Sequence, residues 1–191
     1  MSNTQMENTR FKSHGFTVVE IVIVILLIGI ISTVAISRLL EGDTYNAAVV
    51  RDQIISLARA GHQRSLGRSN VALIIRPNGN NIELTTAADF VDANDYSSLQ
   101  TSSIDARSVA VSGDVNITAN CGVTPGTDLL TNASPMVIQF DELGDLYRGG
   151  VTGAVGYPFT VTTAVRLCIN NDPIVSICFS PAGFAFPGGC E

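Results

Sequence analysis

An apolar stretch near the N-terminus, interrupted by one carboxylate, limits what this chain can fold into. Between Phe16 and Ile36 the only polar residues are Thr17, Glu20, Ser32 and Thr33. About 20 mostly apolar residues in a helix are enough to cross a bilayer. A carboxylate in such a segment costs about 2.5 to 3.5 kcal/mol on insertion scales. We therefore predict a transmembrane helix over residues 16–36 in which Glu20 has a specific role.

The charges that precede this stretch predict its orientation. Arg10, Lys12 and His14 lie just before it, and excess positive charge stays on the cytoplasmic side of a membrane, so the bulk of the chain is expected outside. An alternative is a signal peptide with a basic n-region, cleaved near Ala35-Ile36-Ser37. The apolar run is longer than a typical h-region, and Glu20 would have no purpose in a discarded segment. We therefore favour a retained helix.

The residues at the start of the stretch resemble a known processing signal. Gly15-Phe16-Thr17-Val18-Val19-Glu20 is similar to the class III prepilin site of the type IV pilin and pseudopilin family, usually written Gly-Phe-Thr-Leu-Ile-Glu. The resemblance implies that a prepilin peptidase cuts between Gly15 and Phe16 and methylates the new amino group of Phe16. Residues 1–15 would then be a cleaved leader, and the apolar helix would remain in the mature protein.

The same resemblance implies a role in assembly for Glu20. In the family, this carboxylate pairs with the N-terminal amine of a neighbouring subunit. Two buried charges are tolerated when they are paired, and these two pair only at the correct axial register. Ser37 stands where family members commonly carry a helix-kinking proline, so the sequence lacks the usual cause of a kink there.

Helical periodicity continues beyond the apolar stretch. Residues spaced by three or four form one stripe: Ala47, Val50, Ile54, Leu57, Ala58, Gly61 and Ser65. The opposite face carries Arg51, Asp52, Ser56, Arg59, His62 and Gln63. This pattern is typical of an amphipathic helix that covers a globular domain. We predict that the first helix continues over residues 37–68, with Gly42-Asp43 as the place where it could be interrupted.

The rest of the chain, residues 69–191, predicts a β-rich head domain. The turn Pro77-Asn78-Gly79-Asn80 between Val71–Arg76 and Asn81–Thr86 indicates a hairpin. Further predicted strands are Ser108–Ser112, Val115–Ala119, Met136–Phe140, Asp145–Arg148, Phe159–Ile169, Ile174–Ser180 and Phe184–Phe186. The polar segment 87–105 is predicted to be a loop. A long helix packed on an antiparallel sheet is an α+β arrangement, and by the resemblance it is the pilin fold.

The four cysteines all lie in the segment that is expected to be exported. An even number of cysteines in an oxidising compartment favours disulfides, and Cys121, Cys168, Cys178 and Cys190 allow three connectivities. A tight turn centred on Asn171-Asp172 would put Cys168 and Cys178 on opposite sides of a sheet. We therefore favour Cys121 with Cys168 and Cys178 with Cys190.

Sequence patterns of enzymes and cofactor sites are absent. The only lysine is Lys12, so there is no phosphate-binding Gly-x-x-x-x-Gly-Lys loop, and Cys-x-x-Cys metal pairs are also missing. Asp89, Asp92, Asn94 and Asp95 form an oxygen-rich patch that could hold calcium, although solvated acidic loops are common. Removing residues 1–15 changes the formal charge from −6 to −7, which argues against a general grip on nucleic acid. We expect no enzyme, no cofactor and no resident metal.

Four aromatic residues near the C-terminus, Tyr157, Phe159, Phe184 and Phe186, have two interpretations. They could contact a partner, but strand aromatics more commonly pack into the core. We favour the core.

Together these features predict a structural subunit of a filament. The stretches Arg51–Arg59 and Ala182–Cys190 look most like minor pilins of the mannose-sensitive haemagglutinin (MSHA) type IV pilus. The expected partners are other pilin subunits, the prepilin peptidase and an inner-membrane assembly platform. The expected location is the inner membrane and then the pilus surface. The alternatives are a minor pseudopilin of type II secretion, a periplasmic binding or adhesive protein with a cleaved signal peptide, and a secreted enzyme.

Overall fold

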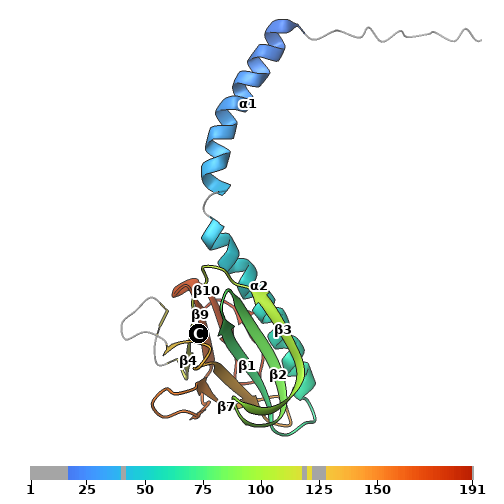
Figure 1. Cartoon of the computed structure of the whole chain (residues 1–191), viewed down its shortest axis with the longest axis vertical. Helices are drawn as coiled ribbons and strands as arrows, with labels where there is room; N and C mark the ends of the chain where they lie inside the picture. Colours follow the sequence, from blue (N-terminus) through green and yellow to red (C-terminus); the bar gives the residue numbers. More distant parts are fainter. Residues whose placement is uncertain (1–16, 40–41, 118–119, 122–127, 191) are drawn as a thin grey trace, which may run out of the picture. The chain divides into compact units, whose positions relative to one another are not determined.

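The structure is a computed structural model that describes residues 17–39, 42–117, 120–121 and 128–190, with the backbone alone from 33 to 39 and from 42 to 44. The chain divides into two compact units, residues 1–41 and 42–191. Figure 1 traces both units. The predicted cleavage residues Gly15 and Phe16 lie outside the described residues.

The first unit contains helix α1, Val18–Leu39. Its N-cap is Thr17, whose Oγ1 accepts a hydrogen bond from the backbone N–H of Glu20 at 3.2 Å. The helix continues through Ser37 without a break. Leu40 and Glu41 lie outside the described residues, so the continuity of one helix over 16–68 stays a prediction.

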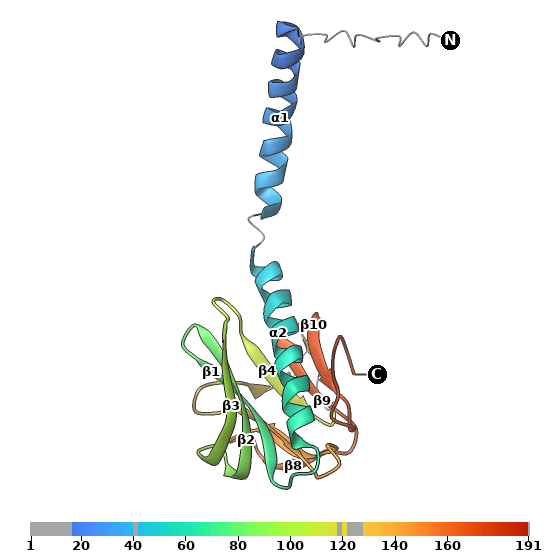
Figure 2. The same cartoon turned by 90° about the vertical axis from the view of Figure 1, so that its right-hand side faces the viewer.

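The second unit, which we call the head, begins with helix α2, Gly42–Ser65. The helix lies against the strands of the head (Figures 1 and 2). Its buried stripe includes Ala47, Val50, Ile54, Ala58 and Ser65. The predicted apolar stripe is therefore confirmed, and it packs into the core of the head.

Two antiparallel sheets follow α2. The six-stranded sheet has the order β3-β2-β1-β6-β7-β8, and the five-stranded sheet has the order β11-β10-β9-β4-β5. The strands of the first sheet are β1 Val71–Asn78, β2 Asn81–Asp92, β3 Asp95–Asp105, β6 Met136–Phe140, β7 Leu146–Val151 and β8 Phe159–Thr160. Those of the second are β4 Val111–Val115, β5 Asp128–Leu129, β9 Val165–Ile169, β10 Asp172–Phe179 and β11 Ala185–Pro187.

One apolar core joins α2 to strands of both sheets. Ile54 of α2, Leu73 and Ile138 of the six-stranded sheet, and Leu167 and Ile177 of the five-stranded sheet are all at most 1% exposed. Burying a side chain of this size is worth about 1.5 to 3 kcal/mol. The helix and the sheets therefore stabilise one another as a single domain.

The edges of the two sheets differ in length. Within the described part of the chain, β5 and β8 have two residues each and β11 has three, whereas β3 has eleven. The pairing of β3 with β2 runs in unbroken register from Gln100 to Asp105 and shifts beyond Gln100. The shift leaves Leu99 unpaired, which is a β-bulge.

Several strand predictions hold and others need correction. The hairpin of β1 and β2 is confirmed, with Asn78 paired to Asn81 around Gly79-Asn80. The predicted loop over 87–105 is wrong, because this segment forms the end of β2 and all of β3. Predicted strands Ser108–Ser112 and Val115–Ala119 are replaced by the single strand β4, which ends where Asn116 and Ile117 adopt positive φ; residues 118–119 lie outside the described part.

The C-terminal strands also differ from the prediction in detail. The predicted strand Phe159–Ile169 is two strands, β8 and β9, with residues 161–164 between them. Asn170 and Asn171, both with positive φ, form the turn between β9 and β10, one residue earlier than expected. Left-handed φ values in a two-residue turn are typical of a tight hairpin.

Two disulfides close the head. Cys121 is bonded to Cys168, with 5.7 Å between their Cα atoms, and Cys178 is bonded to Cys190, with 5.2 Å. This is the pairing that we favoured, but one step of the reasoning was wrong. A register shift in β10 pairs Cys178 with Arg166, so Cys178 lies on the same face of the sheet as Cys168.

A second, smaller apolar cluster lies on the other face of the six-stranded sheet. It contains Ala72, Ile74, Ala87, Ala93 and Val137, with Phe90, Tyr96 and Tyr157 packed against it. Burial raises the pKa of the Tyr157 phenol, and the charge of Asp92 adds to this shift. The turn between β2 and β3 is therefore attached to the sheet.

Candidate functional site

The N-terminal end of α1 holds Glu20 in a defined position. The backbone N–H groups of Glu20 and Ile21 donate to the carbonyl of Thr17, at 3.1 and 3.3 Å. Thr17-Val18-Val19-Glu20 has the spacing of a capping box, in which the N-cap hydroxyl accepts from the third residue of the helix. A carboxylate in the first turn is also favoured by the positive end of the helix dipole. The hydrogen bonds to Thr17 therefore fix the position of Glu20 in the first turn of α1.

The side chains of α1 are unlike those of a helix from a soluble core. Its described large apolar residues, from Val18 to Ile31, are between 45% and 79% exposed on all sides. A helix that is apolar all round is stable only in lipid or when it is surrounded by protein. Over the stretch of the chain that the structure describes, no helix is long and apolar enough to cross a membrane.

The N-terminal segment matches a known family model. Residues 10–36 match the model described as the prokaryotic N-terminal methylation motif. The chain therefore carries the class III prepilin signal of type IV pilins and pseudopilins. This signal supports a type IV pilin or pseudopilin, and it implies processing by prepilin peptidase and assembly with other pilin subunits.

The other two comparisons found no relative. No curated protein matches the chain. No solved structure matches it.

The acidic patch proposed for calcium has another role in the structure. One carboxylate oxygen of Asp92 accepts hydrogen bonds from the backbone N–H groups of Asn94 and Asp95, at 2.7 and 3.1 Å. Asp89 adopts a positive φ of 49°. Among the described residues, no group of three His, Cys, Asp or Glu side chains could hold a metal ion. The patch is a turn that Asp92 stabilises.

Two exposed ion pairs lie at the head surface. Arg107 binds Asp105 through Nη2 at 2.6 Å, and Arg51 binds Asp52 through Nε at 2.9 Å. The hydrogen bond from the Arg107 side chain lowers the pKa of Asp105, while desolvation acts in the opposite direction. Exposed pairs of this kind contribute little to the stability of the fold because solvent screens their charges, so they mainly orient the side chains.

His62 is a residue that the sequence pattern placed wrongly. We predicted it on the polar face of the helix, but it is only 8% exposed. Its ring lies 5.0 Å from the ring of Phe184 and 5.9 Å from that of Phe140. A Cβ at Gly144 or Gly183 would come within 2.7 or 2.5 Å of the imidazole. His62 therefore occupies space that two glycine turns leave open at the end of α2.

The C-terminal aromatic residues also correct a prediction. Phe184 is 58% exposed and Phe186 is 37% exposed, so the interpretation of both as core residues is wrong. Tyr157 and Phe159 are half-buried, as a strand aromatic beside a core would be. The exposed pair belongs to the segment around β11, which lies beside α2.

Proposed function

We propose that this protein is a minor pilin of a type IV pilus of the MSHA type, with the pilin fold. The single observation that supports a pilin or pseudopilin is the methylation motif over residues 10–36, with Glu20 in the first turn of an exposed apolar helix. A helix with apolar side chains exposed all round is suited to a filament core built from many copies.

The proposed mechanism starts in the inner membrane. The apolar run from Phe16 to Ile36 anchors the subunit with its head in the periplasm, and prepilin peptidase removes residues 1–15 and methylates Phe16. The assembly platform then lifts the subunit from lipid into the helical bundle. Packing among apolar side chains replaces lipid contacts, and Glu20 pairs with the amine of a neighbouring subunit. That pairing fixes the axial position.

A minor pseudopilin of type II secretion is the related alternative, because it carries the same signal. The similarity of Ala182–Cys190 to MSHA minor pilins favours the pilus, and the two disulfides suit a head that is exposed outside the cell. A periplasmic protein with a cleaved signal peptide is a different class. It would lack residues 16–37 after export.

Mass spectrometry of the mature N-terminus tests the proposal. A chain that begins at N-methylated Phe16 is the expected result. A chain that begins after Ser37 would exclude a pilin or pseudopilin. Deletion of the pilus assembly platform or of the secretion apparatus, each in turn, then identifies the filament: the proposal requires that loss of the pilus platform removes the protein from the cell surface.

A further inference from the structure

The two disulfides of the head differ in their exposure to solvent. Cys121 and Cys168 are 5% and 0% exposed, and Cys178 is 1% exposed, whereas Cys190 is half-buried. A disulfide is reduced when a thiolate reaches one of its sulfur atoms, so the rate depends on access. A thiolate can therefore approach the Cys178–Cys190 bond from the side of Cys190, while the Cys121–Cys168 bond is covered on both sides.

The Cys178–Cys190 bond holds a segment that has few other attachments to the head. We call residues 186–190 the strap, and each of its residues is exposed or half-buried. β11 pairs with β10 over three residues, and one of them is Pro187, which has no N–H to donate. The N–H of Gly188 donates to the carbonyl of Ser176 at 2.9 Å. The strap therefore adds no buried side chain to the core.

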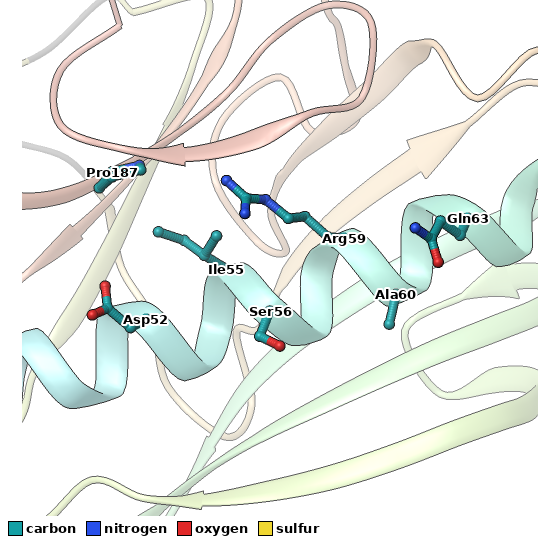
Figure 3. Close-up of a pocket in the computed structure, with 7 residues that line it drawn as sticks. All are labelled: Asp52, Ile55, Ser56, Arg59, Ala60, Gln63 and Pro187. Carbon is teal, nitrogen blue, oxygen red and sulfur yellow. The ribbon is translucent and has the colours of Figure 1, made fainter.

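The strap also packs loosely against α2. A hollow of about 450 Å³ lies between the helix and β11, and Ile55, Arg59 and Pro187 line it. Figure 3 shows Ile55 and Arg59 extending from the helix toward the segment that carries Pro187. A well-packed interior has few voids larger than a water molecule, so a hollow of this size leaves Pro187 with few contacts to the helix.

The residues just before the strap are held more firmly. Ala185 is 1% exposed, and its carbonyl accepts a hydrogen bond from Nε of Arg59 at 2.9 Å. The carbonyl of Pro181 accepts a hydrogen bond from the N–H of Leu146 at 2.7 Å. These contacts do not depend on the disulfide. If the disulfide opens, the movement should therefore stop near Ala185.

We propose that the Cys178–Cys190 bond is a redox-sensitive switch, whose reduction releases the strap from β10 and α2 and leaves the rest of the head folded. The reductant is a dithiol, such as a thiol–disulfide oxidoreductase with a Cys-x-x-Cys pair. The proposal rests on the head alone and is independent of the function proposed above.

The reaction is an ordinary thiol–disulfide exchange. One thiolate of the reductant attacks the sulfur of Cys190, the S–S bond breaks, and Cys178 leaves as a thiolate that takes up a proton. The second thiol of the reductant then attacks the mixed disulfide and releases Cys190 as a thiol. The dithiol is thereby oxidised to a disulfide, and both cysteines of the head are reduced.

Release of the strap changes the surface of the head in two places. Ile55 of α2 is 5% exposed and Cys178 of β10 is 1% exposed while the strap is attached. Ile55 lines the hollow beside Pro187, and Cys178 pairs with Phe186. The reduced head therefore exposes an apolar side chain and a thiol that the oxidised head covers.

Reduction of the full chain in detergent micelles tests the difference between the two bonds. Samples are incubated with dithiothreitol in the absence of denaturant and quenched with N-ethylmaleimide at increasing times, and tandem mass spectrometry locates the labelled cysteines. Cys178 and Cys190 should become labelled at least roughly tenfold faster than Cys121 and Cys168, because reduction of the covered bond requires the head to open first.

Hydrogen exchange measures the release of the strap itself. After reduction of Cys178–Cys190, the fragment that contains Gly188 should exchange at least roughly tenfold faster, whereas fragments from β1 should keep their protection. The double variant Cys178→Ser/Cys190→Ser should show the fast exchange without a reductant. It is also the matched control, because dithiothreitol should then produce no further change in the strap.

Three outcomes would overturn the proposal. Equal rates of reduction for the two disulfides would exclude preferential access to Cys178–Cys190. Unchanged exchange at Gly188 after reduction of that bond would show that other contacts hold the strap. Loss of protection in β1 together with the strap, in the reduced protein or in the double variant, would mean that the bond stabilises the whole head instead of one segment.

Discussion

The two helices of this chain have similar lengths, 22 residues in α1 and 24 in α2, but opposite relations to the rest of the molecule. Every described side chain of α1 is exposed, whereas α2 buries a stripe that includes Ile54 at 0% exposure. The apolar residues of α2 stabilise its own domain. Those of α1 are not buried within their own unit, and an apolar helix surface of this kind is stable in lipid or when it is surrounded by protein.

The largest effect should follow from Glu20→Ala. Removing the carboxylate of α1 should leave membrane insertion and leader cleavage intact but reduce incorporation into filaments at least roughly tenfold, because the buried amine of a neighbouring subunit loses its partner. Immunoblots of sheared filaments measure the incorporation. Glu142→Ala, at an exposed head position, is the control. Normal incorporation of the Glu20 variant would refute the role in register.

The next prediction compares the contributions of the two helices to the stability of the head. Ile54→Ala should lower the free energy of unfolding of the head by about 3 kcal/mol, since it removes a fully buried side chain and leaves a cavity. Ile25→Ala, at a position that is 60% exposed in α1, should leave that free energy unchanged. Urea unfolding followed by circular dichroism suits a chain without tryptophan. Equal losses in both variants would mean that α1 contributes to the head.

Glycine substitutions give a smaller contrast. A Cβ at Gly183, where φ is +78°, would meet the carbonyl oxygen of Gly144 at 2.3 Å, whereas Gly79, where φ is +62°, has open space around it. Both Gly→Ala changes should cost about 1 kcal/mol for the left-handed backbone, and Gly183→Ala about 2 kcal/mol more for overpacking.

Gly29→Ala completes this series in α1. Nothing lies within 4 Å of the position that a Cβ would take there. Alanine should therefore be tolerated, favour the helix and leave the melting temperature of the head unchanged. Thermal melting of the head ranks the three variants. A Gly183→Ala protein as stable as Gly79→Ala would mean that the turn beside His62 moves easily.

The smallest effect concerns the exposed pair of Asp105 and Arg107. The pKa of Asp105 is lowered in the folded head, so its contribution to stability is present above the pKa of an unfolded aspartate. It is lost as the pH falls through the lower folded pKa. Asp105→Asn should therefore reduce the melting temperature slightly at neutral pH and not at all in strong acid. Asp128→Asn changes an exposed acid on β5 and is the control. A decrease in the melting temperature of Asp105→Asn that is the same at neutral and acidic pH would contradict a role for the Asp105 charge.

Sequence reasoning was most successful where the signal is local. The hairpin of β1 and β2 follows from Gly79 and its neighbours, and the stripe of α2 follows from its apolar spacing. Strand β3 was missed because nearly all of its side chains are exposed or half-buried, so no alternation of apolar residues marks it. Backbone pairing with β2 and the contact between the hydroxyls of Thr85 and Thr101, at 3.1 Å, hold it instead.

The same difference between local and distant signals applies to the candidate functional residues. Glu20 is recognisable because its position depends on a few residues around it. His62 was not, because the atoms that cover it belong to turns some 80 and 120 residues further along the chain, at Gly144 and Gly183. The orientation of Arg59 also depends on a distant segment, because its Nε donates to the carbonyl of Ala185. Helical periodicity alone shows only that Arg59 lies on the polar face.

Because the sheet edges differ in length, a further strand can add to the head at one edge more readily than at the others. A strand that adds to a sheet needs a row of free backbone groups, and edges of two or three residues provide few of them. Of the edges in the described part of the chain, only β3 has such a row, and the bulge at Leu99 confines its regular part to Gln100–Asp105. That part contains no lysine, arginine or proline. If heads associate by strand pairing at high concentration, they should therefore do so through β3. The substitution Ser103→Lys should prevent this pairing by placing a charge on that edge.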